Sequence, residues 1–215
     1  MKTRDRIIHS ALALFNEQGE PNVTTNHIAA DLGISPGNLY YHFRNKEEII
    51  HSIFDQYALD LTTSFQPETS VDTDQQRLLA YLDATFQLMW RYRFFYANLP
   101  DILRRDAVLQ DKYLTAQQAL KANLVVTLTQ FRATGWLDMD DDGIESLCDN
   151  LKLVASSWIF YQSAQAPQAK ITPTVIYQGV LQILSMVLPM STDKGQAVVA
   201  EIIEHYHQQM ANTLA

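Results

Sequence analysis

Cysteine is nearly missing from this sequence, which has one in 215 residues. A single thiol, Cys148, excludes an intrachain disulfide and suits a reducing cytoplasm, and we expect it to be a small buried apolar residue. Glycine is also scarce, and no glycine pattern of a nucleotide-binding loop or a nucleophile elbow occurs. The sequence therefore argues against a disulfide-stapled secreted protein and against an enzyme, and it predicts no cofactor.

Targeting and membrane signals are missing as well. The amino terminus is charged from Lys2 to Arg6, which is not typical of a secretory signal. We recognise no uncharged apolar run of about 18 residues, the length that a membrane-spanning helix needs. We therefore expect a soluble, cytoplasmic protein without a membrane segment.

Positive charge is in short supply, since 16 basic residues face 24 acidic ones and the net charge is −8. Residues 1–51 carry five basic and six acidic residues, or −1, which leaves −7 for the remainder. Bulk charge therefore does not draw this chain to a polyanion. Because charges are screened over about 8 Å at physiological ionic strength, a local cluster can still act alone. The candidate cluster is Lys2, Arg4, Arg6, Arg44 and Lys46.

What the sequence does have is helical periodicity throughout a chain that is 47% hydrophobic, enough to bury a core. We see no strand pattern and no repeat, so we predict an all-α protein of about ten helices. Pro100 should interrupt one of them, and Gln66 to Asp74 should form a loop. The expected helices cover residues 3–18, 24–32, 36–42, 46–65, 75–97, 99–106, 108–134, 142–163, 173–188 and 193–212.

The stretch from Thr24 to Glu48 contains three helix-start signals, and the rest of the chain is organised around it. Thr24 or Thr25 can cap a first helix, which Gly33 ends. Ser35 and Pro36 are a cap and a first helical residue, so a second short helix follows. Two short helices joined by such a turn are a helix-turn-helix, whose second helix can enter the major groove of DNA.

The second helix sorts its side chains by face. Leu39 and Phe43 should pack inward, which leaves Gly37, Asn38 and the aromatic residues that follow them facing outward. Asn38 can form a bidentate pair with adenine. Lys46 starts the next helix, where a cation opposes the helix dipole unless an anion sits there, and a DNA phosphate is such an anion. The predicted DNA contacts are Thr24, Thr25, Ser35, Pro36, Gly37, Asn38, Tyr40, Tyr41, His42 and Lys46.

Residues 4 to 50 resemble the amino-terminal part of the tetracycline-repressor (TetR) family of bacterial regulators. The resemblance implies a DNA-binding domain at 1–48, a helical ligand-binding and dimerisation domain at 49–215, and a repressor that a small-molecule effector releases from a palindromic operator. The residues that carry it are Arg6-Ile7-Ile8, Ala11, Leu14-Phe15, Gly19, Thr24-Thr25, Ile28-Ala29, Gly33-Ile34-Ser35, Gly37-Asn38-Leu39-Tyr40, His42-Phe43 and Lys46-Glu47.

The helices expected at 142–163 and 173–188 are apolar round more than half of their circumference. Such helices must be covered on two sides, by their own chain or by a second copy. Two from each subunit would make a four-helix bundle, and a twofold dimer would present two recognition helices to one palindrome. A monomer that covers these faces internally is the alternative.

Aromatic residues gather in the carboxyl-terminal three quarters of the chain. Most can be core, but each Trp and Tyr also brings a polar atom that needs a partner. A largely apolar cavity with a few polar groups is typical of a small-molecule site, and similar regulators hold their ligand in this part of the fold. The candidate pocket residues are Phe86, Met89, Trp90, Phe94, Tyr113, Gln117, Trp158 and Tyr161.

An acidic stretch from Asp138 to Asp149 follows most of the calcium-loop pattern, with Asp138, Asp140, Asp142 and Asp149 at ligand positions. The last is shorter than the usual glutamate, and Glu145 occupies a position where an apolar residue is expected. The alternative, which we prefer, is that these acids cap and complement the helix that begins near 142, so that no metal binds.

We expect a homodimeric transcriptional repressor that binds a double-stranded DNA operator and responds to a small-molecule effector. The effector would act by shifting the helix at 46–65. One rival is a helical protein-interaction module without DNA binding. Another is a small all-helical enzyme, which the missing catalytic set disfavours.

Overall fold

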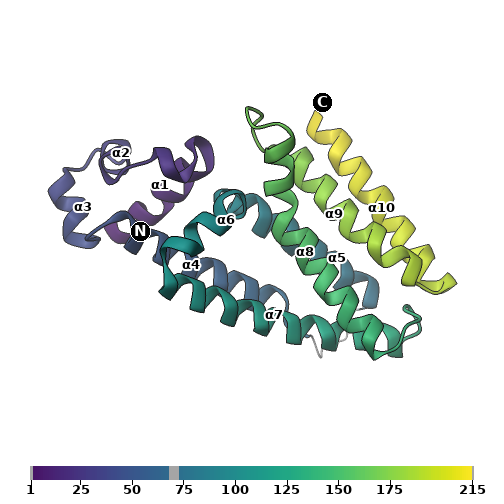
Figure 1. Cartoon of the computed structure of the whole chain (residues 1–215). Helices are drawn as coiled ribbons and strands as arrows, with labels where there is room; N and C mark the ends of the chain where they lie inside the picture. Colours follow the sequence, from purple (N-terminus) through teal and green to yellow (C-terminus); the bar gives the residue numbers. More distant parts are fainter. Residues whose placement is uncertain (1, 68–72, 215) are drawn as a thin grey trace.

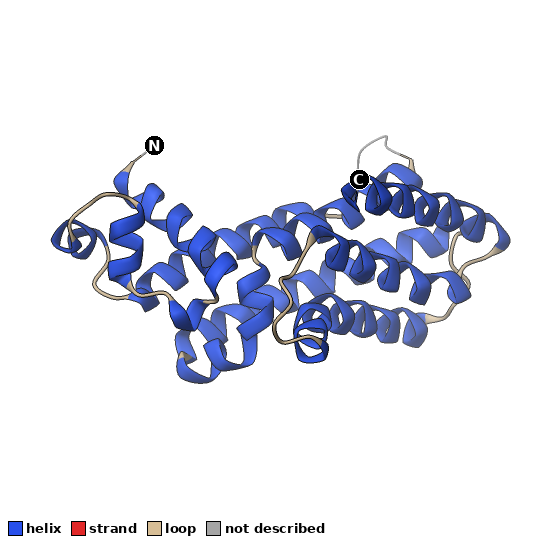
Figure 2. Ribbon diagram, turned by 90° about the horizontal axis from the view of Figure 1, so that it is seen from above, coloured by secondary structure: helices blue, strands red, loops and turns tan. Residues whose placement is uncertain are grey.

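A computed structural model describes residues 2–67 and 73–214. Among these residues every regular element is a helix (Figure 2), and Leu137 and Ser191 form one isolated β-bridge. The prediction of an all-α fold with about ten helices is confirmed. The helices are α1 (Thr3–Gln18), α2 (Thr25–Asp31), α3 (Pro36–His42), α4 (Lys46–Ser64), α5 (Asp74–Arg91), α6 (Arg93–Arg105), α7 (Ala107–Ala133), α8 (Asp141–Gln165), α9 (Pro173–Val187) and α10 (Asp193–Leu214), with the 3-10 turns η1 (Glu20–Asn22) and η2 (Leu188–Met190).

The helices form an elongated molecule with a different group at each end (Figure 1). Helices α1 to α3 stand together at one end, and α5, α8, α9 and α10 pack side by side toward the other. Between them α4 runs along α7 and also packs on α1, while α6 lies against α1, α7 and α8. The two end groups are therefore connected by α4 and by α6.

Side-chain caps fix the helix boundaries that the sequence predicts. The hydroxyls of Thr24 and Ser35 accept hydrogen bonds from backbone amides at the starts of α2 and α3, and the Asn45 side chain does the same for α4. Gly33 follows α2 with a φ of +64°, where a Cβ would be strained. The predicted loop at 66–74 lies partly outside the described residues, at 68–72.

The break between α5 and α6 lies at Tyr92, so the expectation that Pro100 interrupts the helix is wrong. Pro100 sits inside α6. The break has a tertiary cause, because Asn16 of α1 forms hydrogen bonds with two of the backbone groups that it frees. The Asn16 Nδ2 donates to the Arg91 carbonyl at 2.8 Å, and the Asn16 Oδ1 accepts from the Phe94 amide at 3.0 Å.

Residues 173–190 correct the statement that no long uncharged apolar run exists. This segment of 18 residues has a mean hydropathy of 1.3 and is long and apolar enough to cross a membrane by length and composition. Its place in the fold argues for a core helix, because α9 packs on α5, α8 and α10. Helix α10 also covers part of the apolar surface of α9, which the sequence analysis expected either the same chain or a second subunit to cover.

Candidate nucleic-acid interface

Helices α2 and α3 are held on α1 and α4 by a closed apolar core. Ile28 of α2 and Leu39 of α3 are fully buried, and Phe43 after α3 is nearly so. These side chains meet Ile7 and Phe15 of α1 in one cluster. The prediction that Leu39 and Phe43 face inward is confirmed, so the opposite face of α3 is fixed outward.

The outward face of α3 is polar and aromatic. Gly37 and Asn38 are exposed, and Tyr41 is 85% exposed, which is unusual for so large an apolar ring. The Tyr41 ring meets the His42 ring edge to face at 5.1 Å. The Tyr40 hydroxyl lies 3.0 Å from the Thr25 hydroxyl, so this pair braces α3 against α2. Pro36 and Ser35 are exposed at the start of the same helix.

The anion beside Lys46 differs from the DNA phosphate that the sequence suggested. The anion at the start of α4 is Glu20 of the same chain, whose carboxylate lies 2.8 Å from the Lys46 Nζ. The same Nζ donates to the carbonyls of Glu20 and Val23 at 3.0 and 3.1 Å. The sequence signal for an anion was sound, but the partner is internal, because η1 folds back beside α4. The Lys46 ammonium is thus occupied within the protein.

Glu20 also links the α1–α3 unit to α6. Its side chain is 1% exposed, and its second oxygen lies 2.7 Å from the Arg105 Nη2 at the end of α6. A buried carboxylate between two cations is compensated for its lost hydration. Together with Asn16, which caps the start of α6, Glu20 ties the α1–α3 unit to both ends of that helix.

The remaining cations of the predicted cluster lie on the surface. Arg4 donates to the Ser52 hydroxyl at 2.8 Å and stacks over the Phe43 ring at 4.7 Å from its centroid, and it stays exposed. Lys2, Arg6 and Arg44 are exposed too, and within the described chain none of them forms an ion pair. Four exposed cations therefore accompany α3 in each chain.

A cavity of about 120 Å³ lies in the larger helical part of the molecule, and its lining comes from α4 to α10. Its wall is mainly leucine and other apolar side chains, with a few polar groups. The lining residues are Tyr57, Leu61, Phe65, Leu78, Tyr81, Leu82, Thr85, Leu88, Tyr96, Gln117, Leu120, Leu124, Thr127, Leu128, Phe131, Trp136, Leu137, Leu151, Lys152, Ala155, Ser156, Ile183, Leu184, Val187, Ser191 and Val199.

Of the eight candidate pocket residues, only Gln117 lines this cavity. The other seven lie outside its lining, and their role as ligand contacts stays a prediction. Met89 and Phe94 are buried core, and Tyr161 is 52% exposed. Trp90 carries Arg93 over its ring, and Trp158 donates to the Val175 carbonyl at 2.7 Å. Phe86 stacks on Tyr177, and Tyr113 meets Phe95 edge to face.

The side chains that do line the cavity follow the same sequence pattern as ordinary buried helix residues. Along α7 the lining positions recur every three or four residues, and they are Gln117, Leu120, Leu124, Thr127, Leu128 and Phe131. That spacing is typical of any buried helix face, and it does not distinguish a filled core from a hollow one. The signal that was available was the polar Gln117 within this mainly apolar row.

The acidic stretch behaves as a helix start. The Asp140 carboxylate accepts from the Gly143 amide at 2.8 Å and caps α8, as the alternative to a metal site predicts. Asp149 pairs with Lys121, and Asp141 pairs with Arg132. Within the residues that the structure describes, no group of three or more acidic, histidine or cysteine side chains is arranged for a metal ion.

Two family profiles match the chain. The profile described as "Bacterial regulatory proteins, tetR family" matches residues 7–53, and the TetR profile described as "Bacterial transcriptional repressor" matches residues 56–199. The first contains the helix-turn-helix, and the second contains most of the cavity wall. Together they extend over both ends of the molecule.

Individual relatives agree with these profiles. The regulator TtgW of Pseudomonas putida is 33% identical over 84 residues, which is 39% of this chain and 63% of that protein. The negative regulator IcaR of the biofilm operon icaADBC in Staphylococcus epidermidis is 31% identical over 45% of this chain and 52% of its own length. The chain thus matches less than two thirds of each of these relatives.

Solved structures match over nearly the whole chain. A TetR-family transcriptional regulator from Marinobacter aquaeolei has a TM-score of 0.85 and 36% identity, covering 96% of this chain and 99% of its own. SmeT, the repressor of a multidrug efflux pump in Stenotrophomonas maltophilia, has a TM-score of 0.62 and 19% identity, covering 90% and 92%. The second likeness concerns the fold alone.

Proposed function

Because the chain belongs to the TetR family of bacterial transcriptional regulators, we propose that it is a cytoplasmic repressor that leaves a palindromic operator when a small molecule fills its cavity. We assign DNA binding to residues 1–48 and ligand binding and dimerisation to 49–215. The observation that carries the proposal is the exposed, polar face of α3 on a helix whose other face is fully buried. Such a helix is held rigidly while its free side meets a partner.

The proposed DNA contacts follow from that face. Asn38 reads a base edge in the major groove, beside the small residues Pro36 and Gly37. Hydroxyl and imidazole groups position the helix on the phosphates, and exposed cations add charge. Lys46 is left out, because Glu20 already occupies it. The positioning residues are Thr24, Thr25, Ser35, Tyr40, Tyr41 and His42, with Lys2, Arg4, Arg6 and Arg44.

A homodimer is part of the proposal. Helix α8 carries Leu153, Phe160 and Tyr161 on its outward side, and they are 61%, 52% and 52% exposed. They are spaced seven and eight residues apart, so they form one stripe that a second copy of α8 can cover. Twofold pairing would set the two α3 helices about 34 to 36 Å apart, one turn of DNA.

The effector would act through the two connections between the ends of the molecule. Tyr57 and Leu61 of α4 and Tyr96 of α6 line the cavity, and both helices also contact the α1–α3 unit. A ligand that displaces them changes the separation of the two α3 helices. Moving the DNA-competent state from 99:1 to 1:99 requires about 5.5 kcal/mol of differential binding, which two ligands per dimer can share.

The experiment that tests the proposal is a selection of bound duplexes from random DNA with the full chain, followed by sedimentation of the purified protein. We expect an enriched palindrome and a dimer. A Leu153→Glu variant should sediment as a monomer and lose most of its operator affinity, because each α3 then binds a half-site alone. Enrichment of no sequence at low salt, or a monomeric wild type at micromolar concentration, contradicts the proposal.

A further inference from the structure

Polar side chains of α7 and α8 meet at one end of the cavity. Lys121 of α7 pairs with Glu145 and Asp149 of α8 at 2.9 Å, which fixes the antiparallel register of these two helices. One further turn along each helix brings Gln117 to the same level as Lys152. Both side chains line the cavity. Ser156, one turn beyond Lys152, adds a hydroxyl at this end.

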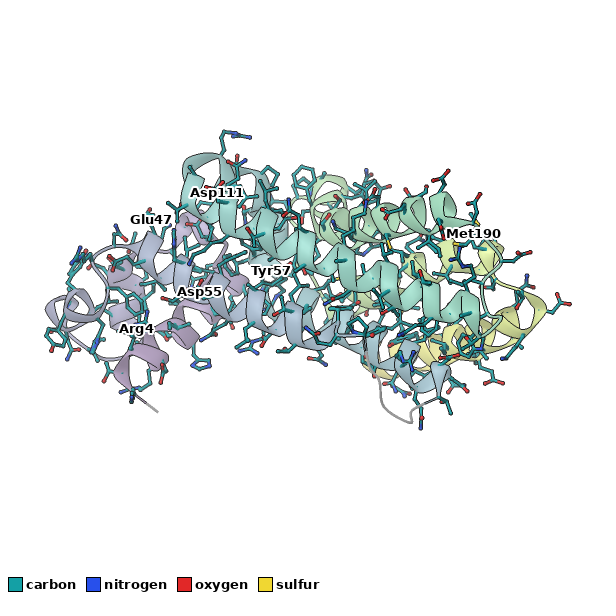
Figure 3. The ribbon with its side chains drawn as sticks, turned by 90° about the horizontal axis from the view of Figure 1, so that it is seen from below. Arg4, Glu47, Asp55, Tyr57, Asp111 and Met190 are labelled. Atoms are coloured by element: carbon teal, nitrogen blue, oxygen red, sulfur yellow. The ribbon has the colours of Figure 1, made fainter. Side chains whose placement is uncertain are left out.

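Two buried tyrosines from other helices line the cavity as well. Tyr57 of α4 and Tyr96 of α6 are 2% and 7% exposed, and the Tyr96 hydroxyl donates to the Tyr57 hydroxyl at 3.4 Å. Figure 3 shows Tyr57 midway along the molecule, where α4 and α7 run together. The Phe95 ring lies 5.4 Å from the Tyr57 ring and 6.3 Å from the ring of Tyr113, which is one turn before Gln117. The tyrosine pair therefore lies at the same end as Gln117.

This hydroxyl pair has one hydrogen to spare. Two phenols carry two donors, and the contact between them uses one. Among the described residues no acceptor takes the other, although both side chains are buried. Burial raises the pKa of Tyr57 and of Tyr96 well above the usual tyrosine value, so both stay protonated at neutral pH. An unused buried donor that lines a cavity calls for an acceptor on a ligand.

Lys152 adds an unmatched charge. It is only partly exposed, and no carboxylate of the described chain lies within ion-pair distance of its ammonium. The nearby acids of α8 are already used, since Glu145 and Asp149 both pair with Lys121. A partly buried ammonium without a counterion favours an anion beside it.

The rest of the cavity wall is mainly apolar, and its polar side chains, which include Tyr81, Thr127 and Ser191, are hydrogen-bonded within the protein. The lining on α7 runs from Gln117 to Phe131, which is about 21 Å of helix at 1.5 Å per residue. The volume is only about 120 Å³. Empty apolar cavities of roughly this volume hold a benzene molecule. A long space with so small a volume fits an unbranched chain better than a fused ring system. A ten-carbon chain is larger than benzene, so it enters only by displacing the wall, as the proposed function requires.

We propose that the effector of this regulator is an organic monocarboxylate with a linear aliphatic body, whose head lies between Lys152, Gln117 and the Tyr57–Tyr96 hydroxyl pair. The proposal deepens the proposed function and rests on it, because it names the ligand of the same cavity. Lys152 supplies the countercharge, and the spare phenolic hydrogen donates to a carboxylate oxygen. Since Tyr57 belongs to α4, the head group contacts the helix that leads to the DNA-binding unit.

Calorimetric titration of the full-length dimer with three ten-carbon probes of different head charge tests this. The probes are decanoate, decan-1-ol and decyltrimethylammonium, each below its micelle concentration. Decanoate should bind at least about tenfold more tightly than the alcohol, since hydrogen bonds to a charged group are the stronger ones, and the cation should bind weakest. Equal or tighter binding of the alcohol overturns the proposal.

Two variants locate the head group. Lys152→Met keeps most of the side-chain stem, and it should weaken decanoate by about tenfold or more while it leaves the alcohol unchanged. Tyr57→Phe should have the same selective effect. Lys170→Met is the matched control, because it removes one positive charge from an exposed loop and should change neither titration. Retention of the wild-type preference for decanoate in Lys152→Met overturns the proposal.

Operator release separates this inference from the proposed function. The selected operator duplex is titrated with protein in the presence of each probe. Release by decanoate alone supports both. Tight, Lys152-dependent decanoate binding without release supports the ligand class but contradicts effector control. Release by an uncharged or cationic compound, with no decanoate binding, supports effector control and overturns the ligand class.

Discussion

The two ends of this molecule are built on opposite principles. The α1–α3 unit encloses a filled core in which Ile7, Ile28 and Leu39 are fully buried, and its buried polar side chains, Ser10 and Glu20, have partners within the protein. The larger end contains a cavity, and Lys152, which has no ion-pair partner in the described chain, belongs to its wall. A filled core moves as a rigid body, whereas a hollow one can change shape when a ligand fills it. The difference supports the proposed division of roles, with sensing at one end and DNA reading at the other.

Substituting one glycine at each end puts this comparison to its strongest test. A Cβ on Gly195 would lie 2.2 Å from the Trp136 carbonyl oxygen, a backbone atom that cannot move aside. Gly195→Ala should lower the free energy of unfolding by about 3 kcal/mol or more, as overpacking in a fixed backbone does. The melting temperature, followed by circular dichroism at fixed protein concentration, should fall by about 6 to 12 °C.

Gly37→Ala is the matched change at the reading end. A Cβ there meets only the Ser35 hydroxyl, at 3.9 Å, and α3 gains a better helix former. The melting temperature should stay equal or rise slightly, while operator affinity falls because the added methyl group stands on the face that approaches DNA. A strongly destabilised Gly37→Ala, or a stable Gly195→Ala, contradicts the contrast between the two ends.

The connection between the ends gives the next largest effect. Glu20→Gln removes the buried carboxylate that holds Lys46 and Arg105 together. Both cations are partly exposed, so we expect a loss of about 2 kcal/mol in the free energy of unfolding, below the range for fully buried pairs. Denaturant unfolding measures it. Asp101→Asn is the control, because its pair with Arg104 is exposed on both sides and should contribute almost nothing.

The sequence predicted the reading end well because its signals are local. The caps Thr24, Ser35 and Asn45 and the terminator Gly33 act within a few residues of themselves, and the structure confirms each of them. The failures involve partners far along the chain. Asn16 breaks the helix at Tyr92 across more than 70 residues, and no local pattern contains that contact.

The same distinction explains the candidate sites. Lys46 signalled an anion correctly, but the identity of that anion depended on how η1 folds back, which spacing alone does not determine. Apart from Gln117, the sequence did not indicate the lining of this cavity, because a hollow row and a filled row of leucines look alike on one helix. The hydrogen bond between Tyr57 and Tyr96 joins α4 to α6 across 39 residues, so no local pattern predicts it.

The effect of base reading is confined to one base pair of each half-site and does not involve stability. Asn38→Ala should keep the fold, because Asn38 contacts the Ser35 hydroxyl through its backbone amide, which alanine also has. We expect a loss of about 1 to 3 kcal/mol in discrimination at one base pair of each half-site and little change elsewhere. Competition of matched and singly mismatched operators measures this. A uniform loss over all sequences contradicts a base-reading role.

The smallest effect should come from Lys46, and it sharpens the assignment of charges to the reading end. Four exposed cations per chain, Lys2, Arg4, Arg6 and Arg44, limit the slope of log affinity against log salt to about −7 per dimer, at roughly 0.9 per phosphate contact. Lys46→Met should leave that slope unchanged, because its ammonium faces Glu20 and not solvent. Arg44→Met, the neighbouring comparison, should reduce the slope by about 2 if both subunits contact phosphate through it.

The slope is measured by filter binding over a salt series, at a temperature where circular dichroism shows that each variant is folded. A slope steeper than −7, or a Lys46→Met slope reduced as much as that of Arg44→Met, would mean that DNA draws Lys46 away from Glu20, so that the connection between the two ends opens on binding.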